Sequence, residues 1–446
     1  MLYFVSKRMR SSEKSMTTQK KPFIAWRAGF VLVACVTAGL LTASSSRLMA
    51  QARATACNQA ASDPITFVDV PGHPFTPILT KDGCWIFVSL SNPKEGPPSG
   101  VGVLHRTGGT ISLVRVVATD GGPAGMVLTH DGKVLVGAVD DRIVFLDTSR
   151  MISGEGEAVL GYFREPEYHG ELGEMKITTP GAVYVNVTSD DRWLFVSDEW
   201  AQRITVIDLQ KAHSSGFKEF SLVGAIPTGG LPIALTLSPD GRYLYTTAEV
   251  ADKKWAWPVE CKPEGKDPNQ AKAEYPQGAV VVIDVARATR EPAKSVIAKV
   301  PSGCSAVRLA ISPKGDRAYV TARNADALLA FDTNKLVRDP DHALIGKVPV
   351  GRSPVGVEVA DGGRKVVVAN SNRFADATNQ RQNQNLTLID TDKIALGPAA
   401  VLGMIPAGGF PRELRATADG QTLLVTNFTS NTLEMVDLAR VPLQPR

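Results

Sequence analysis

Apolar and polar residues alternate along short segments of this chain, and the segments recur seven times in the same order. Each repeat opens with a ten-residue stretch that closes in a turn residue, Gly or Asp. The seven stretches are PFTPILTKDG (74–83), PAGMVLTHDG (123–132), AVYVNVTSDD (182–191), PIALTLSPDG (232–241), AVRLAISPKG (306–315), PVGVEVADGG (354–363) and PRELRATADG (411–420). Alternation with a period of two predicts a strand, and the closing residues predict a hairpin turn.

Three further apolar runs follow each turn in most repeats. The second run is short, as in YLYTTA, and the third ends in Asp, as in ITVIDL or VVVIDV. The fourth ends in a Pro-Gly stretch such as GAIPTGG. Four strands in a unit of about 40 to 50 residues are typical of a propeller blade. We therefore predict an all-β protein, a seven-bladed β-propeller of four-stranded blades.

The seventh repeat lacks a fourth strand of its own. Its third strand, LEMVDL, ends at Leu438, and only ARVPLQPR follows. The segment TFVDVPGHP (66–74) is similar to the fourth strands elsewhere, so we predict that residues 66–71 complete the last blade. The propeller then spans 66–438, with a lead-in at 53–65 and a tail at 439–446. Such closure leaves no long unpaired sheet edge.

The first 52 residues have the form of a secretory signal peptide. Lys20, Lys21 and Arg27 precede an uncharged, largely apolar run at 28–43, and Ala50-Gln51-Ala52 offers a small-x-small cleavage site. This pattern predicts a periplasmic or secreted protein. Two alternatives are an uncleaved anchor helix, which sixteen residues span poorly, and lipid attachment at Cys35. We expect membrane contact only through an uncleaved segment.

Removal of the predicted signal peptide changes the charge of the chain. The full sequence carries 49 basic and 45 acidic residues, whereas residues 1–52 hold eight basic residues and one acidic residue. The remainder therefore has 41 basic and 44 acidic residues, a net charge of −3. It also contains no basic cluster with interleaved aromatic residues, so we predict no nucleic-acid partner.

Four cysteines remain after the predicted cleavage site: Cys57, Cys84, Cys261 and Cys304. An even number in an exported chain favours disulfides. Three pairings are possible, and we predict Cys57 with Cys84 and Cys261 with Cys304, the second of which would tether a long insertion to the next blade. Free buried thiols are the alternative.

Three insertions interrupt the regular spacing. The turn residue and the Asp that ends the third strand are 17 residues apart in three repeats, but 43 apart in the fourth and 27 apart in the sixth. The insertions lie at 163–181, 249–278 and 371–384. In a propeller, loops from second to third strands and loops between blades emerge on one face, so we predict that this looped face binds ligand.

Each insertion has its own candidate chemistry. The fourth repeat's insertion contributes Trp255 and Trp257, which either cap a loop or stack on a ligand. The sixth repeat's insertion is a polar, amide-rich stretch. The link at 163–181 is acidic, and we interpret it mainly as a solvated loop with a metal site as the alternative. Its charged residues are Glu165, Glu167, His169, Glu171 and Glu174.

The innermost strands also present polar residues to the central channel. Positions six and four before each turn residue are apolar and predict the core, so positions seven and five before it face the channel. Charge gathers there on three consecutive blades, opposite Tyr184 and Asn186. The candidate ligand-binding residues of the channel and its rim are His73, Tyr184, Asn186, Arg308, Glu358, Arg412, Glu413 and Arg415. They suit an anionic or polyol ligand, although arginine and glutamate could equally satisfy one another.

These repeats resemble the YVTN-repeat family of propellers, within the wider group of lactonase-type propellers. The residues that carry the resemblance are SPDGRYLYTTA (238–248), SPKGDRAYVTARNADALLAFD (312–332) and DGQTLLVTNFTSNTLEMVD (419–437). The resemblance covers essentially all of 66–438 and implies a seven-bladed ring. Because every matching residue is a turn, strand or core position, it does not assign chemistry.

Three functions remain open at this point. The first is an exported, non-catalytic binding protein for a small anionic molecule, a cell-envelope component or a protein partner on the looped face. The second is a lactonase-like hydrolase, with His73 or Glu413 as base or metal ligand and Arg308 polarising a carbonyl. The third is a redox role with a quinone-type cofactor. The chain lacks G-x-S-x-G, H-E-x-x-H, P-loop and C-x-x-C-H motifs, so no cofactor is identified. We expect a monomer.

Overall fold

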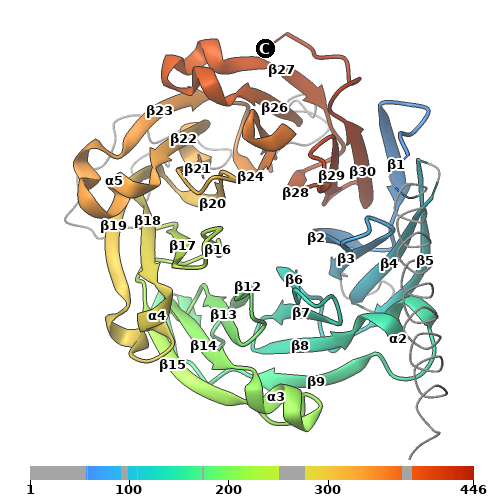
Figure 1. The fold of residues 1–446 in the computed structure, drawn as a ribbon, viewed down its shortest axis with the longest axis vertical. Coiled ribbons are helices and arrows are strands. Elements are labelled where there is room, and N and C mark those ends of the chain that lie inside the picture. Colours follow the sequence, from blue (N-terminus) through green and yellow to red (C-terminus); the bar gives the residue numbers. More distant parts are fainter. Residues whose placement is uncertain are drawn as a thin grey trace, which may run out of the picture. The chain divides into compact units, whose positions relative to one another are not determined.

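Seven four-stranded antiparallel sheets form a closed ring around a central opening (Figure 1). The computed structural model describes residues 57, 59–91, 99–107, 109–172, 175–250, 277–373 and 384–445. Residues 53–446 form one compact unit. The predicted fold class, a seven-bladed β-propeller closed by an N-terminal strand, is confirmed.

Each blade runs outward from the channel in chain order. Blade 1 consists of β2 (His73–Leu79), β3 (Trp85–Ser91), β4 (Gly100–Thr107) and β5 (Thr110–Ala118). Blade 2 consists of β6 (Met126–Leu128), β7 (Val134–Val139), β8 (Arg142–Asp147) and β9 (Val159–Arg164). Blade 3 consists of β12 (Ala182–Val187), β13 (Trp193–Asp198), β14 (Arg203–Asp208) and β15 (Ser221–Pro227).

The remaining blades repeat this order. Blade 4 consists of β16 (Thr236–Leu237), β17 (Tyr243–Ala248), β18 (Gln277–Asp284) and β19 (Val296–Cys304). Blade 5 consists of β20 (Ala306–Ile311), β21 (Arg317–Ala322), β22 (Ala327–Asp332) and β23 (Leu344–Pro349). Blade 6 consists of β24 (Pro354–Ala360), β25 (Lys365–Asn370), β26 (Asn385–Asp390) and β27 (Val401–Pro406).

Blade 7 joins the two ends of the propeller. It consists of β28 (Pro411–Ala416), β29 (Thr422–Asn427), β30 (Thr432–Asp437) and β1 (Ile65–Asp69). Strand β1 pairs antiparallel with β30, with Ile65 opposite Val436 and Asp69 opposite Thr432. The predicted closing segment, 66–71, is therefore paired through 69, and the strand begins one residue earlier. Buried residues from blade 7, such as Leu433, share a hydrophobic cluster with blade 1 residues such as Ile86.

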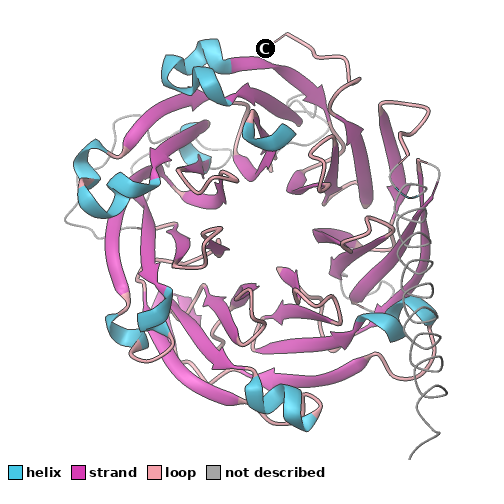
Figure 2. Ribbon diagram, viewed as in Figure 1, coloured by secondary structure: helices cyan, strands magenta, loops and turns pink. Residues whose placement is uncertain are grey.

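Short helices connect the two outer strands of most blades (Figure 2). They are α2 (Thr148–Ser153), α3 (Gln210–Ser215), α4 (Val285–Ala288), α5 (Thr333–Arg338) and the 3₁₀ segment η7 (Thr391–Ala400). The Asp that ends the third strand explains four of these starts, because its carboxylate accepts a backbone N–H from the first turn. The capping residues are Asp147, Asp284, Asp332 and Asp390. Blade 1 has His105 near this position and turns directly from β4 into β5.

Smaller elements fill the remaining connections. The 3₁₀ segments are η2 (Pro292–Lys294), η3 (Arg323–Ala325), η4 (Pro340–His342) and η5 (Asp361–Gly363). A separate hairpin of β10 (Gly170–Leu172) and β11 (Met175–Ile177) lies within the link between blades 2 and 3. Of the residues placed in the structure, no helix is long and apolar enough to cross a membrane.

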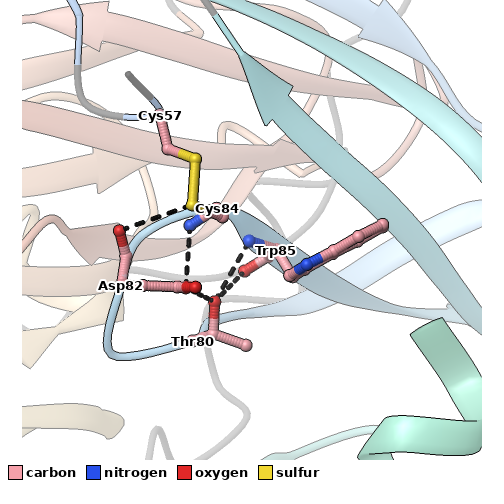
Figure 3. Close-up of a disulfide and its surroundings, with 5 residues drawn as sticks. All are labelled: Cys57, Thr80, Asp82, Cys84 and Trp85. Carbon is pink, nitrogen blue, oxygen red and sulfur yellow. Dashed lines mark hydrogen bonds between the residues drawn. A yellow bond between two sulfur atoms is a disulfide. The ribbon is translucent and has the colours of Figure 1, made fainter. Parts of the chain in front are cut away.

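A disulfide fastens the lead-in to blade 1 (Figure 3). Cys57 is bonded to Cys84, as predicted, and both residues are buried. Cys84 directly follows the first hairpin turn, where its N–H is donated to Asp82 Oδ1 at 3.0 Å. The Thr80 hydroxyl bonds to the same carboxylate oxygen, a contact that recurs in the hairpin turns of other blades. Cys304 is buried and disulfide-bonded, whereas its predicted partner, Cys261, lies outside the described residues.

Neighbouring blades are linked near the channel by a repeated hydroxyl bridge. A Ser or Thr of the second strand accepts a backbone N–H from the inner strand of its own blade, or from the residues just before that strand. It donates to a backbone carbonyl at the same place in the next blade. Thr321, for example, accepts from Arg308 N at 3.1 Å and donates to Val355 O at 2.8 Å. The bridging residues are Ser89, Ser197, Thr247, Thr321 and Thr426. The Thr426 bridge reaches Phe75 and so joins blade 7 to blade 1.

Replacement of Thr321 by Val should destabilise the propeller by about 1–3 kcal/mol, because the near-isosteric change leaves a buried N–H and a buried carbonyl without a partner. Urea denaturation monitored by circular dichroism measures the change. Thr110→Val removes an exposed hydroxyl at a turn and should shift the free energy of unfolding by less than about 0.5 kcal/mol. Equal shifts for the two variants would show that the bridge contributes nothing.

Candidate functional site

Three side chains from different blades meet across the central channel. Arg308 Nε of β20 donates to Glu413 Oε1 of β28 at 2.5 Å, and the Tyr184 hydroxyl of β12 donates to the same oxygen. The Arg308 guanidinium also lies 4.5 Å from the centre of the Tyr184 ring. The Arg308 and Glu413 side chains are only 8% and 12% exposed. These residues, all predicted to face the channel, form what we call the partition.

One cavity lies on the turn side of the partition. It has a volume of about 800 Å³ and is bordered by the hairpin turns, including Thr80–Gly83 and 417–419. The predicted residues Asn186, Glu358 and Arg415 line it. Asn186 donates to Leu235 O at 3.0 Å, and Glu358 Oε1 accepts from Ala416 N at 3.1 Å. Burial raises the pKa of Glu358, and the neighbouring Arg415 opposes that rise. Asn186 and Glu358 are thus engaged with the protein itself.

A second cavity lies on the opposite side, where the loops between blades and after second strands emerge. We call it the looped-face cavity. It has a volume of about 670 Å³, and Arg308 of the partition borders it as well as the first cavity. Its lining residues are Val183, Glu199, Trp200, Leu231, Ile233, Glu249, Val307, Arg308, Arg323, Val355, Arg373, Phe410 and Arg412. Among the described lining residues, arginines outnumber glutamates.

Arg412 is the most unusual residue of the looped-face cavity. Its guanidinium carbon lies 3.9 Å from the Phe75 ring centre, 4.9 Å from Phe428 and 5.5 Å from Phe410. Its Nε is buried without a hydrogen-bond partner, and no carboxylate in the described part of the chain forms an ion pair with it. Burial, together with Arg308, lowers the pKa of Arg412 to about 10, so it stays charged at neutral pH. Aromatic rings thus hold a cation whose hydrogen-bonding capacity is unused.

Glu199 is the complementary feature on another wall. It is the first residue after β13, and it precedes Trp200 in the cavity lining. Burial raises the pKa of Glu199 to about 7, and Glu249 adds to the rise, while Arg308, Arg323 and Arg412 oppose it. Within the described ranges no residue forms a hydrogen bond or an ion pair with this carboxyl group. Glu249, by contrast, is ion-paired with Arg323.

A bulge in the innermost strands explains which lining residues the sequence analysis missed. The register shifts between Ala306 and Arg308 in blade 5, and similar shifts occur in blades 1, 3, 6 and 7. Strict alternation therefore fails, and the residue eight positions before the turn also faces the channel, as Val183, Val307 and Val355 do. The residue that follows the second strand supplies Glu199, Glu249 and Arg323, and this fixed position is a usable sequence signal.

Other predicted residues have different surroundings. His73 Nδ1 lies 2.9 Å from Phe428 O, and its ring stacks on Phe428 at 4.6 Å. It is not among the described residues that line either cavity. Trp255 and Trp257 lie outside the described residues, as does most of the insertion that contains them.

The interpretation of the acidic link as a solvated loop is wrong for Glu165. Its side chain is fully buried, 3.9 Å from the Arg203 guanidinium, which Asp198 also contacts at 3.0 Å. The single arginine draws both carboxyl groups inward, and burial raises the pKa of Glu165 and that of Asp198. In the placed portion of the chain no group of three or more His, Cys, Asp or Glu residues could hold a metal ion.

Comparison with known proteins supports the architecture. No family model matches the chain, and no curated protein matches it. Among solved structures, hydrazine synthase from Kuenenia stuttgartiensis has a TM-score of 0.57 at 16% identity over 83% of this chain and 97% of the other. The Cps50 (Swd1) β-propeller domain from Myceliophteria thermophila has a TM-score of 0.55 at 11% identity, over 84% and 99%.

A third similar structure is a functionally unknown protein from Desulfotomaculum acetoxidans, with a TM-score of 0.53 at 10% identity over 81% and 91% of the two chains. At these identities the similarity concerns the fold alone. The chain is a seven-bladed β-propeller. The resemblance to the YVTN-repeat family stays a prediction.

Proposed function

We propose that this protein is an exported binding protein whose looped-face cavity holds a small organic anion. The observation that carries the proposal is Arg412, a half-buried cation with a buried, unbonded Nε, held by three aromatic rings with no carboxylate partner among the described residues. A buried donor without a partner is costly, and an anionic ligand would remove that cost. The Cys57–Cys84 disulfide is consistent with an oxidising location.

The alternatives from the sequence receive less support. In a lactonase-like hydrolase His73 or Glu413 would act as base or metal ligand. His73 lines neither cavity among the described residues, and the Glu413 carboxylate already accepts from Arg308 and from Tyr184. Those bonds engage the carboxylate within the partition. For a quinone cofactor, the excess of arginine around the cavity offers anion recognition and no specific redox chemistry. A binding function on a YVTN-type propeller requires neither a catalytic base nor a redox cofactor at these residues.

Arg412→Met should weaken the binding of small carboxylates and phosphates at least tenfold, because a hydrogen bond to a charged group contributes about 1.5–3 kcal/mol. Methionine keeps the contact with the phenylalanines but removes the charge. Isothermal titration of citrate, glutarate and ethyl phosphate measures the affinity, and a thermal-shift series supports it.

Arg242→Met is the matched control. Arg242 also stacks on an aromatic side chain, with its guanidinium 5.4 Å from the centre of the Tyr243 ring. It lies beside a hairpin turn, however, on the face of the propeller opposite the looped-face cavity. Its substitution should leave the affinities unchanged. Binding that survives in Arg412→Met, or the failure of every anion to bind the wild-type protein, would refute the proposed function.

A further inference from the structure

We propose that the ligand of the looped-face cavity carries a primary ammonium group beside its anionic groups, and that Glu199 is the partner of that ammonium. This inference rests on the proposed function and narrows the class of ligand. Its basis is that the cavity contains two groups of opposite character, each without a partner among the described residues. Arg412 lies in blade 7 and Glu199 in blade 3, so two blades separate them on one side and three on the other.

The charged groups that face Glu199 are already engaged or held apart from it. Glu249 is paired with Arg323, and both side chains are 11% exposed. Arg308 is bonded to Glu413 in the partition. The aromatic contacts of Arg412 hold its guanidinium on the opposite wall. Despite three nearby arginines, then, no ion pair forms with Glu199 in the described structure.

A ligand ammonium would change the state of this carboxyl group. At present burial and Glu249 favour the protonated form of Glu199. An ammonium at hydrogen-bond distance would stabilise the carboxylate and gain a charge-assisted hydrogen bond. Trp200 lines the same wall, and the face of an indole ring also attracts cations. Glu199 and Trp200 therefore offer a cation subsite opposite the arginines.

The described arginines supply the anion subsite. Arg308 and Arg323 are each ion-paired with a glutamate, whereas Arg412 forms no ion pair with a described carboxylate. The anionic part of the ligand would therefore lie at Arg412, and its ammonium at Glu199. The ligand class is thus a small molecule with one ammonium and at least one anionic group, as in an acidic amino acid or an amino phosphate.

Matched pairs of probes that differ only in the amine test the inference. The pairs are L-glutamate with glutarate, and O-phosphoethanolamine with ethyl phosphate. We expect the amine-bearing member to bind the full wild-type protein at least tenfold more tightly in one pair or both, and the pair that responds identifies the anionic group. Glu199→Gln should abolish this preference.

Proton release provides a readout that does not depend on a variant. Because Glu199 must ionise to pair with an ammonium, binding of the amine at about pH 7 should release a fraction of a proton. Titration of the glutamate and glutarate pair in buffers of different ionisation enthalpy measures this fraction, and glutarate, which is already fully ionised at this pH, should show no release. Glu219→Gln, at a fully exposed carboxylate paired with Lys211, is the control and should keep the preference.

The outcomes separate the two proposals. Equal affinity within both pairs, or a preference that persists in Glu199→Gln, overturns the inference but leaves the anion site in place. Binding of no probe at all overturns the proposed function itself. Preference for the amine, lost in Glu199→Gln and accompanied by proton release, supports the inference.

Discussion

Deletion of residues 53 to 72 will unfold the propeller or make it aggregate. The deletion removes β1, which supplies the outer strand of blade 7 and pairs with β30 at five positions from Ile65↔Val436 to Asp69↔Thr432. It also removes Val70, which is buried in the cluster between blades 7 and 1. Strand β30 is then left with an unpaired edge, which promotes association between molecules. Thermal denaturation by circular dichroism and size-exclusion chromatography will detect the loss.

Cys57→Ser separates the role of the strand from that of the disulfide. This variant keeps β1 but opens a cross-link between cysteines 27 residues apart in sequence. We expect it to remain folded and to lose about 3 kcal/mol of the free energy of unfolding. A deletion variant that melts like the full protein would contradict closure by β1, because no other described segment occupies that edge of β30.

The free energy of unfolding will decrease as pH rises from about 5 to about 8. Burial raises the pKa of Glu434 to about 7, that of Glu199 to about 7 and that of Asp198 to about 6. The pKa of Glu165 is raised as well. Each group binds its proton more tightly when folded than when unfolded. Its contribution to stability is therefore complete below about pH 4 and disappears as the pH passes the folded-state pKa.

Other carboxylates act in the opposite direction but over a different range. Hydrogen bonds lower the pKa of residues such as Asp141 and Asp361, so their stabilisation is present above about pH 4 and is lost in acid. The two groups together place maximal stability near pH 4 to 5. This differs from proteins in which lowered carboxylate pKa values alone govern the profile.

Glu434→Gln tests the assignment of the pH dependence. Glu434 is fully buried and accepts from Asn427 Nδ2 at 2.9 Å and from Gly408 N at 3.2 Å, while its Oε1 has no partner. A glutamine side chain can accept the same two hydrogen bonds, but it does not ionise. Between pH 5 and 8 the variant should lose less of its free energy of unfolding than the wild type does. The difference should be up to about 3 kcal/mol, since one unit of pKa shift corresponds to about 1.4 kcal/mol. Urea midpoints at each pH supply the data. An unchanged slope would exclude Glu434 as a source.

The sequence predicted the ring and its closure because both depend on a repeated local pattern. Apolar alternation, turn residues and the missing fourth strand near Leu438 are visible without any long-range information. The same alternation brought Tyr184, Arg308 and Glu413 together in the channel, and these residues do meet in the partition. The alternation of channel-facing and core-facing residues holds from the seventh position before the turn to the turn itself.

The looped-face cavity was harder to predict for physical reasons. A bulge adds a residue to the inner strand, so the eighth position before the turn also faces the channel. From the sequence alone, the apolar residues at this position would be assigned to the core. Glu199 follows a strand and belongs to no periodic pattern. Its significance depends on burial and on the pairing of Glu249 with Arg323, which the sequence does not reveal. His73, which was predicted at the channel rim, contacts Phe428, whose ring also contacts Arg412.

Closure by β1 also has a consequence for biosynthesis. A ribosome makes Ile65 well before Val436, its partner 371 positions later. At about 5–20 residues per second this interval is about 20 to 75 s. The first strand to be synthesised is thus the last to be paired, and blades 1 to 6 must assemble beside an incomplete ring. Once formed, the Cys57–Cys84 bond would hold the waiting strand next to blade 1 until blade 7 pairs with it.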